Sequence, residues 1–550
     1  MGVCYEQRAD RTRFIIEEDY KIKQEMIQSI KTFNEKRWEE QRKKLQKQST
    51  ELIPQTKRPN TPQPRPSHNE NKIIPKNRTA LSKEYEPEGQ LGEGDYGQVY
   101  LVKHKKMNLH RAMKVISMKL KAEEKVNEEI ELIKQLDHPN IAKLFEYFCD
   151  DDKYYLITEY CEGGDLYDLI KKKKKFSEFS AAYIMFQIFR ALIYCHNVHH
   201  LIHRDIKPEN IVVFRKNNTM EDLYDVKLMD FGIAKIFNKN EKNNDNRIFG
   251  SLNYVAPEII IGKYNEKCDI WSCGVLLYLL VTGVHPFKGK ESEILKKIRK
   301  GNYSFPSGFI EKSSGELREL INKCLINNPN ERISANDALN HPFFSLYDIN
   351  EFFTHVTPAF LNKTINNIKK YETKNSLQEL CLTYFVHNYP NQEDIVLINK
   401  VFSKFNTSNN GKMTKEELKK GLLKYSFSNK GKKSKAAAEK EANHIFSKLD
   451  GNNNGFIECE EFVRAGLDKK IIKNKKVLKI MFNSLDKNKD GEISYEELKE
   501  VFNNEGDNNN IKENEKNIIE LMKSIDTDLN GQISFEEFYN MMLKLIDELV

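Results

Sequence analysis

A short loop that recurs four times toward the C-terminus is the strongest constraint on what this chain can fold into. The loop-like segments start at Asn406, Asp450, Asp486 and Asp526, which are 36 to 44 residues apart. Regular spacing of this kind is the signature of a repeat architecture, in which each unit is one supersecondary structure. The repeat therefore predicts a C-terminal region of similar units that is distinct from the rest of the 550-residue chain.

The last three repeats place oxygen-bearing residues where an EF-hand loop holds calcium. Such a loop needs oxygen ligands at positions 1, 3, 5, 7 and 9, a bidentate Glu at position 12, and Gly at position 6 for a sharp turn. Position 7 contributes its backbone carbonyl, and position 8 is isoleucine in all three loops, as expected if paired loops share a short strand. The predicted Ca²⁺ ligands are Asp450, Asn452, Asn454, Phe456, Glu458 and Glu461, then Asp486, Asn488, Asp490, Glu492, Ser494 and Glu497, then Asp526, Asp528, Asn530, Gln532, Ser534 and Glu537.

The first loop departs from this pattern. Asn406, Ser408 and Asn410 stand where carboxylates are expected, so that Glu417 is its one charged ligand. Because affinity for Ca²⁺ falls as the number of anionic ligands falls, we expect this first site to be weak or empty.

Residues 85–344 change from short β-rich runs to long helical patterns. The β-rich runs are Gln98–Lys103, Arg111–Ile116 and Tyr154–Glu159, and the helical patterns cover Ala181–His196 and Asp269–Thr282. Strands followed by helices predict an α+β fold with a small sheet-rich lobe and a larger helical lobe after it.

A glycine-rich segment near the start of this region has the pattern G-x-G-x-x-G-x-V. Glycines let the backbone close over phosphate groups, so that amide hydrogens face the anion. The alternative is a glycine-rich hairpin without a ligand. The nucleotide-binding residues predicted here are Leu91, Gly92, Glu93, Gly94, Asp95, Tyr96, Gly97, Gln98 and Val99.

Lys114 lies on the next β-rich run and can reach the α- and β-phosphates of ATP if a carboxylate holds it in place. Glu129, on a predicted helix, is the candidate carboxylate, and its neighbour Glu128 is the alternative. Taken by itself, Lys114 is equally consistent with an exposed lysine on a strand.

The segment His203–Asn210 carries residue types that suit phosphoryl transfer. Asp205 is placed to orient the attacking hydroxyl and accept its proton, and Lys207 can neutralise the γ-phosphate as it transfers. Asn210 offers an oxygen to Mg²⁺, and Asp230 of the following Asp-Phe-Gly segment offers a second ligand, because a hard cation prefers oxygen donors.

Ala256-Pro257-Glu258 closes this series of motifs, and Arg332 is available to pair with Glu258. With these elements in this order, residues 85–344 resemble a protein kinase domain, which implies a bilobal fold and the catalytic roles given above. Lys207 after the catalytic Asp resembles the serine/threonine kinases.

The resemblance also implies residues around the nucleotide and the substrate. Thr158 matches the gatekeeper behind the adenine pocket, and Glu159 and Cys161 match hinge residues whose backbone bonds adenine. Asp165, which we include among the ATP-binding residues, and Glu209 match acidic positions that face basic residues upstream of the target hydroxyl. Protein substrates with basic residues near the Ser or Thr are therefore expected.

The segment Ile233–Gly250 contains no Ser, Thr or Tyr. Arg204 therefore has no phosphate to bind there, and phosphorylation of this segment cannot be the main switch. Another form of regulation is required.

An amphipathic stretch with several lysines, Leu361–Val386, joins the two regions. Beside calcium-sensing loops, it indicates a helix that an opened hydrophobic groove can bind, although a plain linker helix packed on the kinase domain is the alternative. Kinase domain, junction and four loops in this order resemble the calcium-dependent protein kinases of plants and protists. The resemblance implies an autoinhibitory junction (345–390) that blocks the cleft at rest. It also implies a calmodulin-like domain of all-α EF-hand pairs (391–550) that relieves the block when Ca²⁺ binds.

Residues 1–84 have a non-globular composition, with a charged helix predicted over Arg13–Gln48 and a proline-rich spacer after it. Gly2 and Cys4 resemble myristoylation and palmitoylation sites, but Glu6 departs from the Ser or Thr expected there. An ordinary cytosolic tail is the alternative.

Hydrophobicity, cysteine content and net charge limit the remaining classes of protein to which the chain can belong. No apolar run reaches the ~18–20 residues of a membrane span. The nine scattered cysteines, without a C-x-x-C pair, indicate reduced thiols. We therefore expect a cytoplasmic protein that acylation could attach to a membrane surface. The net charge of +7 is small for this length, and we expect no nucleic-acid partner.

These features together predict a Ca²⁺-activated serine/threonine protein kinase that uses ATP, Mg²⁺ and Ca²⁺. The rival hypothesis is a calcium-responsive scaffold with an inactive kinase fold, against which the intact Lys114, Asp205, Asn210 and Asp230 argue. A kinase controlled by a separate calmodulin is a lesser rival, because the chain carries its own calcium loops.

Overall fold

The structure of the protein is a computed structural model that describes most of the chain from residue 76 onward. The described residues are 76–77, 81–94, 97–119, 121–150, 152–216, 223–237, 243–244, 251–371, 376–389, 392–425, 427–428, 431–432, 435–451, 454–468, 475–486, 488–503 and 511–547. Several predictions from the sequence fall outside these ranges and stay predictions: the acylation sites Gly2 and Cys4, the helix Arg13–Gln48, and the individual residues Asp95, Tyr96 and Asn452.

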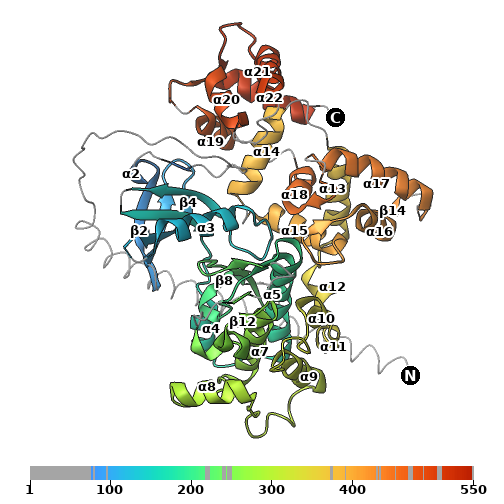
Figure 1. The fold of residues 1–550 in the computed structure, drawn as a ribbon. Helices are drawn as coiled ribbons and strands as arrows, with labels where there is room; N and C mark the ends of the chain where they lie inside the picture. Colours follow the sequence, from blue (N-terminus) through green and yellow to red (C-terminus); the bar gives the residue numbers. More distant parts are fainter. Residues whose placement is uncertain are drawn as a thin grey trace, which may run out of the picture.

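A six-stranded sheet forms the first lobe, with the strand order β1-β5-β6-β4-β3-β2 (Figure 1). All neighbours are antiparallel except β1 and β5. The strands are β1 (Lys76–Asn77), β2 (Tyr85–Gly94), β3 (Gly97–His104), β4 (Leu109–Ser117), β5 (Leu144–Cys149) and β6 (Lys153–Glu159), with α2 (Leu81–Glu84) before β2. Helix α3 (Glu123–Lys134) buries Val126, Ile130 and Ile133, which share one face because they are three or four residues apart.

The second lobe is helical and is organised around α5 (Glu178–Val198) and α7 (Lys267–Thr282). Both helices are apolar nearly all round, as expected for helices in the middle of a core. Around them lie α4 (Leu166–Lys173), α6 (Pro257–Ile261), α8 (Glu291–Lys300), α9 (Gly315–Cys324), α10 (Ala335–Leu339), α11 (Pro342–Ser345), η2 (Pro208–Asn210), η3 (Leu252–Tyr254), β7 (Leu201–Ile202), β8 (Ile211–Lys216), β9 (Tyr224–Leu228), β10 (Lys235–Ile236), β11 (Asn243–Asn244) and β12 (Lys263–Tyr264).

The core of the helical lobe continues beyond residue 344, into the segment predicted to be junction. Helix α12 (Ile349–Phe353) buries Ile349 and Phe353 in the same core. The ring of Phe353 packs against Tyr183 of α5, with 5.8 Å between the ring centroids. Aromatic residues in α12 therefore extend the kinase core, a contact that the sequence pattern alone does not reveal.

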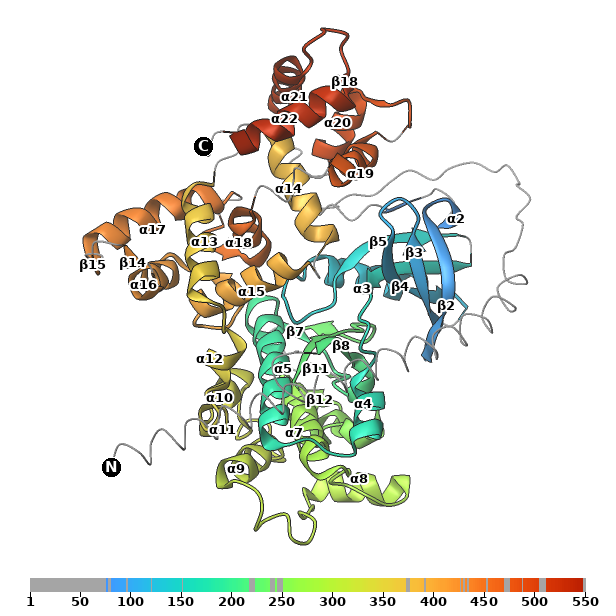
Figure 2. The ribbon, with the colours of Figure 1, turned by 180° about the vertical axis from the view of Figure 1, so that it is seen from behind.

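The predicted junction helix over Leu361–Val386 consists of two helices, α13 (Pro358–Lys369) and α14 (Ser376–Asn388). Lys370 caps the end of α13, and Tyr371, which follows, is buried and non-helical. Both helices pack against α18 (Cys459–Gly466), and α14 also packs against α19 (Lys475–Leu485) and α22 (Phe535–Asp547), as Figure 2 shows. Helices α13 and α14 of the junction are thus packed against the C-terminal domain, whereas α12 belongs to the kinase core.

Among its described residues, the C-terminal region contains two groups of four helices, one on each side of α14 (Figure 1). The remaining helices are α15 (Glu393–Phe405), α16 (Lys415–Tyr425), α17 (Lys435–Leu449), α20 (Tyr495–Asn503) and α21 (Ile511–Ile525). The short strands are β13 (Lys412–Met413), β14 (Phe427–Ser428), β15 (Gly431–Lys432), β16 (Ile457–Glu458), β17 (Glu492–Ile493) and β18 (Ile533–Ser534). Strand β13 pairs with β16 and β17 with β18, so the predicted pairing of neighbouring loops is confirmed.

The eight cysteines that the structure describes are all free thiols. Among the described helices, none combines the length and the apolar character needed to cross a membrane.

The predicted pair between Glu258 and Arg332 is present inside the helical lobe. Both carboxylate oxygens of Glu258 accept hydrogen bonds from the Arg332 guanidinium. Arg332 is 1% exposed, and its guanidinium carbon lies 5.1 Å from the centroid of the Trp271 ring.

Replacing Arg332 by Met should destabilise the helical lobe by about 3–5 kcal/mol, because it leaves the buried Glu258 carboxylate without its cation. Urea unfolding followed by Trp271 fluorescence measures this, in a Trp38→Phe background that leaves Trp271 as the only tryptophan. Lys323→Met, which removes an exposed ion pair with Glu319, is the control and should leave the midpoint near that of the parent. Equal midpoints for both variants would contradict the expectation.

Candidate active site and calcium-binding loops

Lys114, Glu129 and Asp230 meet between the two lobes. The Lys114 ammonium on β4 lies 3.1 Å from Oε1 of Glu129 on α3 and 2.7 Å from Oδ1 of Asp230. Glu128 instead pairs with Lys125 on the exposed side of α3. The structure therefore selects Glu129, rather than Glu128, as the carboxylate that holds Lys114.

The charges in this group stabilise one another. Burial alone would raise the pKa of Asp230, but the Lys114 ammonium and the hydrogen bond from the Gly232 amide lower it to about 2. Burial would likewise lower the pKa of Lys114, and the carboxylates of Asp230 and Glu129 more than reverse this. Asp230 is thus a carboxylate throughout the physiological range, as a metal ligand must be.

Asp205 is held by its neighbours in the segment after β7. The Asn210 side-chain amide donates to the Asp205 backbone oxygen and to Oδ2, at 2.8 Å each. The Lys207 ammonium lies 2.8 Å from the same Oδ2 and 3.0 Å from the Ser251 hydroxyl. The Ser251 amide donates to Oδ1 at 3.3 Å. Asp205, Lys207 and Asn210 are therefore brought together at one point.

Asp269 positions this segment, although the sequence motifs do not include it. It is fully buried in α7 and accepts hydrogen bonds from the backbone amides of His203 and Arg204, at 2.9 and 2.8 Å. His196 bonds the same carboxylate at 2.8 Å. An aspartate inside an otherwise apolar helix is the signal that could have identified it, because buried carboxylates need partners.

The glycine-rich segment forms the hairpin of β2 and β3, with Gly94 opposite Gly97 and Gly92 opposite Val99. A Cβ atom on Gly97 would overlap the carbonyl oxygen of Val115 on β4. Glycine is therefore required at this position by the close approach of the neighbouring strand. The predicted Leu91 is half exposed on β2.

Three side chains of the predicted nucleotide pocket already have local partners. The Thr158 hydroxyl donates to the Ala112 backbone oxygen at 3.4 Å, and Glu159 is buried and paired with Lys227. Asp165 caps α4 by accepting from the Asp168 amide at 2.8 Å. Burial raises the pKa of Asp165. The Cys161 thiol is also buried, which keeps it protonated.

Arg204 has partners other than a phosphate. Its Nε donates to the Ile233 backbone oxygen, and its Nη1 donates to the Tyr264 hydroxyl at 2.7 Å. These contacts join the catalytic segment to the start of the segment that lacks Ser, Thr and Tyr.

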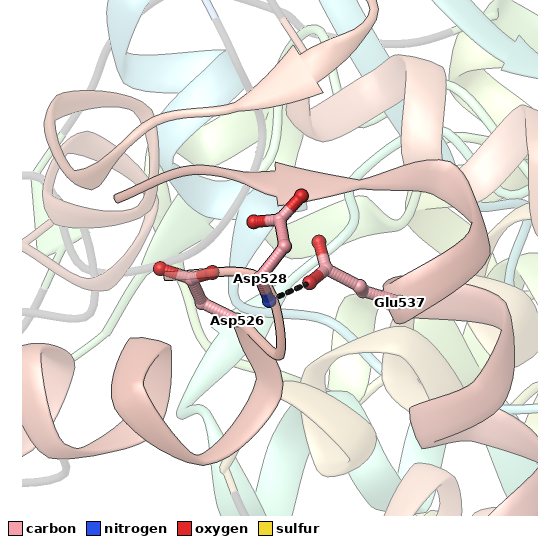
Figure 3. A group of neighbouring side chains, drawn as sticks. All are labelled: Asp526, Asp528 and Glu537. Carbon is pink, nitrogen blue, oxygen red and sulfur yellow. Dashed lines mark hydrogen bonds between the residues drawn. The ribbon is translucent and has the colours of Figure 1, made fainter. Parts of the chain in front are cut away.

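The fourth loop gathers carboxylates as a cation site requires (Figure 3). Oxygens of Asp526, Asp528 and Glu537 lie within 4.8 Å of one another. The buried Oδ1 of Asp526 has no hydrogen-bond partner among the described residues. Burial would raise the pKa of Glu537, but the amides and hydroxyls of Ser534 and Thr527 lower it to about 2. The donor set fits Ca²⁺, which binds oxygen ligands.

The second and third loops are also closed by hydrogen bonds within each loop. The position-1 carboxylates of Asp450 and Asp486 accept from the amides of Gly455 and Gly491, both at 3.1 Å. The position-12 carboxylates also fold back onto their loops: Glu461 accepts from the Glu458 amide at 2.8 Å, and Glu497 accepts from the Asn488 and Ser494 amides at 3.0 and 2.9 Å.

In the first loop, the side-chain amide of Asn406 contacts the oxygens at the other ligand positions. Nδ2 of Asn406 lies 3.3 Å from the Ser408 hydroxyl, 3.2 Å from Oδ1 of Asn410 and 3.0 Å from the Lys412 backbone oxygen. These are the oxygens of positions 3, 5 and 7. Asn406 is 0% exposed, and Glu417 closes the loop on the Ser408 and Thr414 amides. The loop therefore satisfies its ligand oxygens with its own hydrogen-bond donor.

The first helix group also contacts the kinase lobes. The Arg190 guanidinium on α5 donates to the Ser403 hydroxyl on α15 at 2.8 Å, and the Glu460 amide on α18 donates to Asp137 at 3.0 Å. A Cβ atom on Gly411 would come within 2.6 Å of the Tyr194 ring. The calcium loops are thus in direct contact with the catalytic domain.

Residues 85–344 match the protein kinase domain family, and residues 409–468 and 475–543 each match an EF-hand domain pair. The chain is 36% identical over 438 residues to calcium-dependent protein kinase 4 of Plasmodium berghei (strain Anka), covering 78% of this chain and 82% of the relative. It is 36% identical over 433 residues to calcium-dependent protein kinase 5 of Plasmodium falciparum (isolate 3D7), covering 78% and 73%. Calcium-dependent protein kinase 3 of Plasmodium yoelii yoelii is 37% identical over 416 residues, covering 75% and 74%.

These matches cover both the catalytic cleft and the calcium loops, at an identity and a length that establish common descent. The chain belongs to the family of calcium-dependent protein kinases.

Proposed function

We propose that this kinase transfers the γ-phosphoryl group of ATP to Ser or Thr of proteins, with Asp205 as the base and Lys207 beside the transferred group. The observation that carries the proposal is the convergence of Asn210 and Lys207 on Asp205. Because Nδ2 of Asn210 donates to Asp205, its amide oxygen is the atom that remains for a cation. Asn210 and Asp230 would hold Mg²⁺, which would supply positive charge at the phosphates.

Each protein group then has a distinct task. Lys114, fixed by Glu129, would bind the α- and β-phosphates, and the amides of the β2–β3 hairpin would cover them. Asp205 would orient the substrate hydroxyl and accept its proton. Lys207, already 2.8 Å from Asp205, would neutralise charge on the phosphoryl group. Positioning and charge, rather than covalent chemistry, account for catalysis of this kind.

Basic residues near the target hydroxyl would be recognised by Asp165 and Glu209. Asp165 stands at the start of α4, and Glu209 is exposed in η2, directly after Lys207 and Pro208. Two carboxylates beside the catalytic segment favour a substrate that carries Lys or Arg, since opposite charges attract across such a surface.

The junction is proposed to be the inhibitory element at rest. In this structure α13 and α14 contribute Leu361, Ile365, Leu377 and Phe385, among others, to the core of the EF-hand helices. The end of α14 contacts the outer side of the sheet, where the Arg111 guanidinium donates to the Asn388 backbone oxygen. We propose that this is the released arrangement, and that loss of Ca²⁺ frees the junction to cover the cleft.

The full-length protein should phosphorylate a basic Ser/Thr peptide in saturating Ca²⁺ and much more slowly in chelator. Asp205→Asn should lower kcat by about 10²–10⁴-fold, the usual contribution of a general base. A peptide with acidic residues in place of the basic ones tests the role of Asp165 and Glu209 and should be the poorer substrate. Equal rates in chelator and in Ca²⁺ would reject the calcium switch.

Calcium titration by calorimetry should find three bound ions rather than four, because the Asn406 amide fills the first loop. Glu537→Gln should lose one ion, because it removes a carboxylate from the cluster of the fourth loop. Glu417→Gln is the matched control and should still bind three. A fourth ion that disappears in Glu417→Gln would show that the first loop does bind Ca²⁺.

Truncation after residue 356 tests the inhibitory role of the junction while it retains α12, which belongs to the kinase core. The truncated protein should phosphorylate the peptide at the same rate with and without Ca²⁺, and faster than the full-length protein does in chelator. A truncated protein no faster than the full-length protein in chelator would mean that the junction does not inhibit.

A further inference from the structure

The buried carboxylate of Glu129 is shared by two lysines. Its Oε1 accepts from Lys114 at 3.1 Å, and its Oε2 accepts from Lys121 at 2.6 Å. The side chains of Glu129 and Lys121 are only 2% and 7% exposed. The sequence motifs account for Lys114 but assign nothing to Lys121, which lies between β4 and α3.

Lys121 also contacts the segment that begins with Asp230. Its ammonium donates to the backbone oxygen of Gly232 at 3.0 Å. A Cβ atom on Gly232 would lie 3.5 Å from both Nζ of Lys121 and Oε2 of Glu129, so these groups converge on one point. A single ammonium group therefore links α3 to the Asp-Phe-Gly segment.

The burial of Lys121 indicates that this link matters. An ammonium group is unfavourable away from water unless it is paired and hydrogen-bonded. Lys121 meets both conditions through Glu129 and Gly232. By contrast, Lys125 and Glu128 on the same helix lie 2.6 Å apart but are 59% and 61% exposed, and a pair of that kind contributes little.

We propose that Lys121 is a positioning residue for phosphoryl transfer, which keeps Glu129 and the Asp230–Gly232 segment together when Lys114 turns toward the phosphates of ATP. Lys114 is shared between Glu129 and Asp230 here, and a bound nucleotide would compete for it. Lys121 neutralises the other oxygen of Glu129 and does not depend on the nucleotide. This inference rests on the roles proposed above for Lys114, Glu129 and Asp230.

The segment after Gly232 gives a reason for such a link. Residues 233–250 contain no Ser, Thr or Tyr, so no phosphate can be added there to order the cleft. Arg204 instead bonds Ile233 and Tyr264. The Lys121 ammonium, which bonds both Glu129 of α3 and Gly232, would hold α3 and the Asp230–Gly232 segment together. In other switches, a phosphorylated segment has this task.

The test compares full-length Lys121→Met with Lys121→Arg and with Lys125→Met as the control, at saturating Ca²⁺, with ATP and the basic peptide varied. Lys121→Met should lower kcat by about 10- to 100-fold, because small displacements of catalytic groups have effects of this size. The KM for ATP should change by less than about threefold, since binding contacts are retained. Lys121→Arg should recover much of kcat, and Lys125→Met should stay within about twofold of the parent.

Backbone amide hydrogen exchange on the same proteins gives a second readout that does not require activity. Lys121→Met should speed exchange in α3 and in residues 230–236, while Lys125→Met should not. If Lys121→Met does not fold, Lys121→Gln, which keeps a donor but not the charge, takes its place with the same expectations.

Unchanged kcat, or unchanged exchange in α3 and residues 230–236, would overturn the proposal, as would equal losses in Lys125→Met. A parent protein without phosphotransfer would reject the proposed function, and in that case the exchange measurement alone would decide the role of Lys121.

Discussion

The apolar faces of α13 and α14 are the feature on which the arrangement of the molecule depends. Leu361, Ile365, Leu377 and Phe385 lie in one continuous core with the EF-hand helices, so the C-terminal domain is completed by the segment that connects it to the kinase. A helix that contributes to this core cannot at the same time lie over the cleft. Exclusive burial of this apolar surface is the physical basis of the two-state switch proposed above.

The contact between the kinase and the first helix group is polar as well as apolar. Burial of the Arg190 guanidinium, which lies 5.0 Å from the Phe353 ring and bonds Ser403, lowers the pKa of Arg190 to about 10. The Asp137 carboxylate accepts from the Glu460 amide at the start of α18 and pairs with Lys143. Desolvating such groups is unfavourable unless they are paired, and both Arg190 and Asp137 are hydrogen-bonded across this interface. The first loop also lies at this interface, where Gly411 faces the Tyr194 ring.

The cleft itself is organised by buried carboxylates. Asp269 fixes the backbone of His203 and Arg204, and Glu129 holds Lys114 on one oxygen and Lys121 on the other. Both carboxylates are buried and fully paired, so they hold the residues that would contact the substrate in fixed positions. In the proposed mechanism, calcium would act on access to these residues without rebuilding their charges.

Much of the fold and of the candidate site could be predicted from patterns of residues that are close together in the sequence. Spacing alone identified the glycine loop, the Asp205 and Asp230 segments and the four loops, and it predicted a weak first loop, because these features depend on side chains that are close together in the sequence. Tertiary structure decided the rest. It chose Glu129 over Glu128, divided Leu361–Val386 into two helices, joined α12 to the kinase core and brought Lys121 and Asp269 to the site. These outcomes depend on which side chains are buried together in the folded core. Contacts between residues that are far apart in the sequence produce no local periodicity, so a sequence pattern cannot predict them.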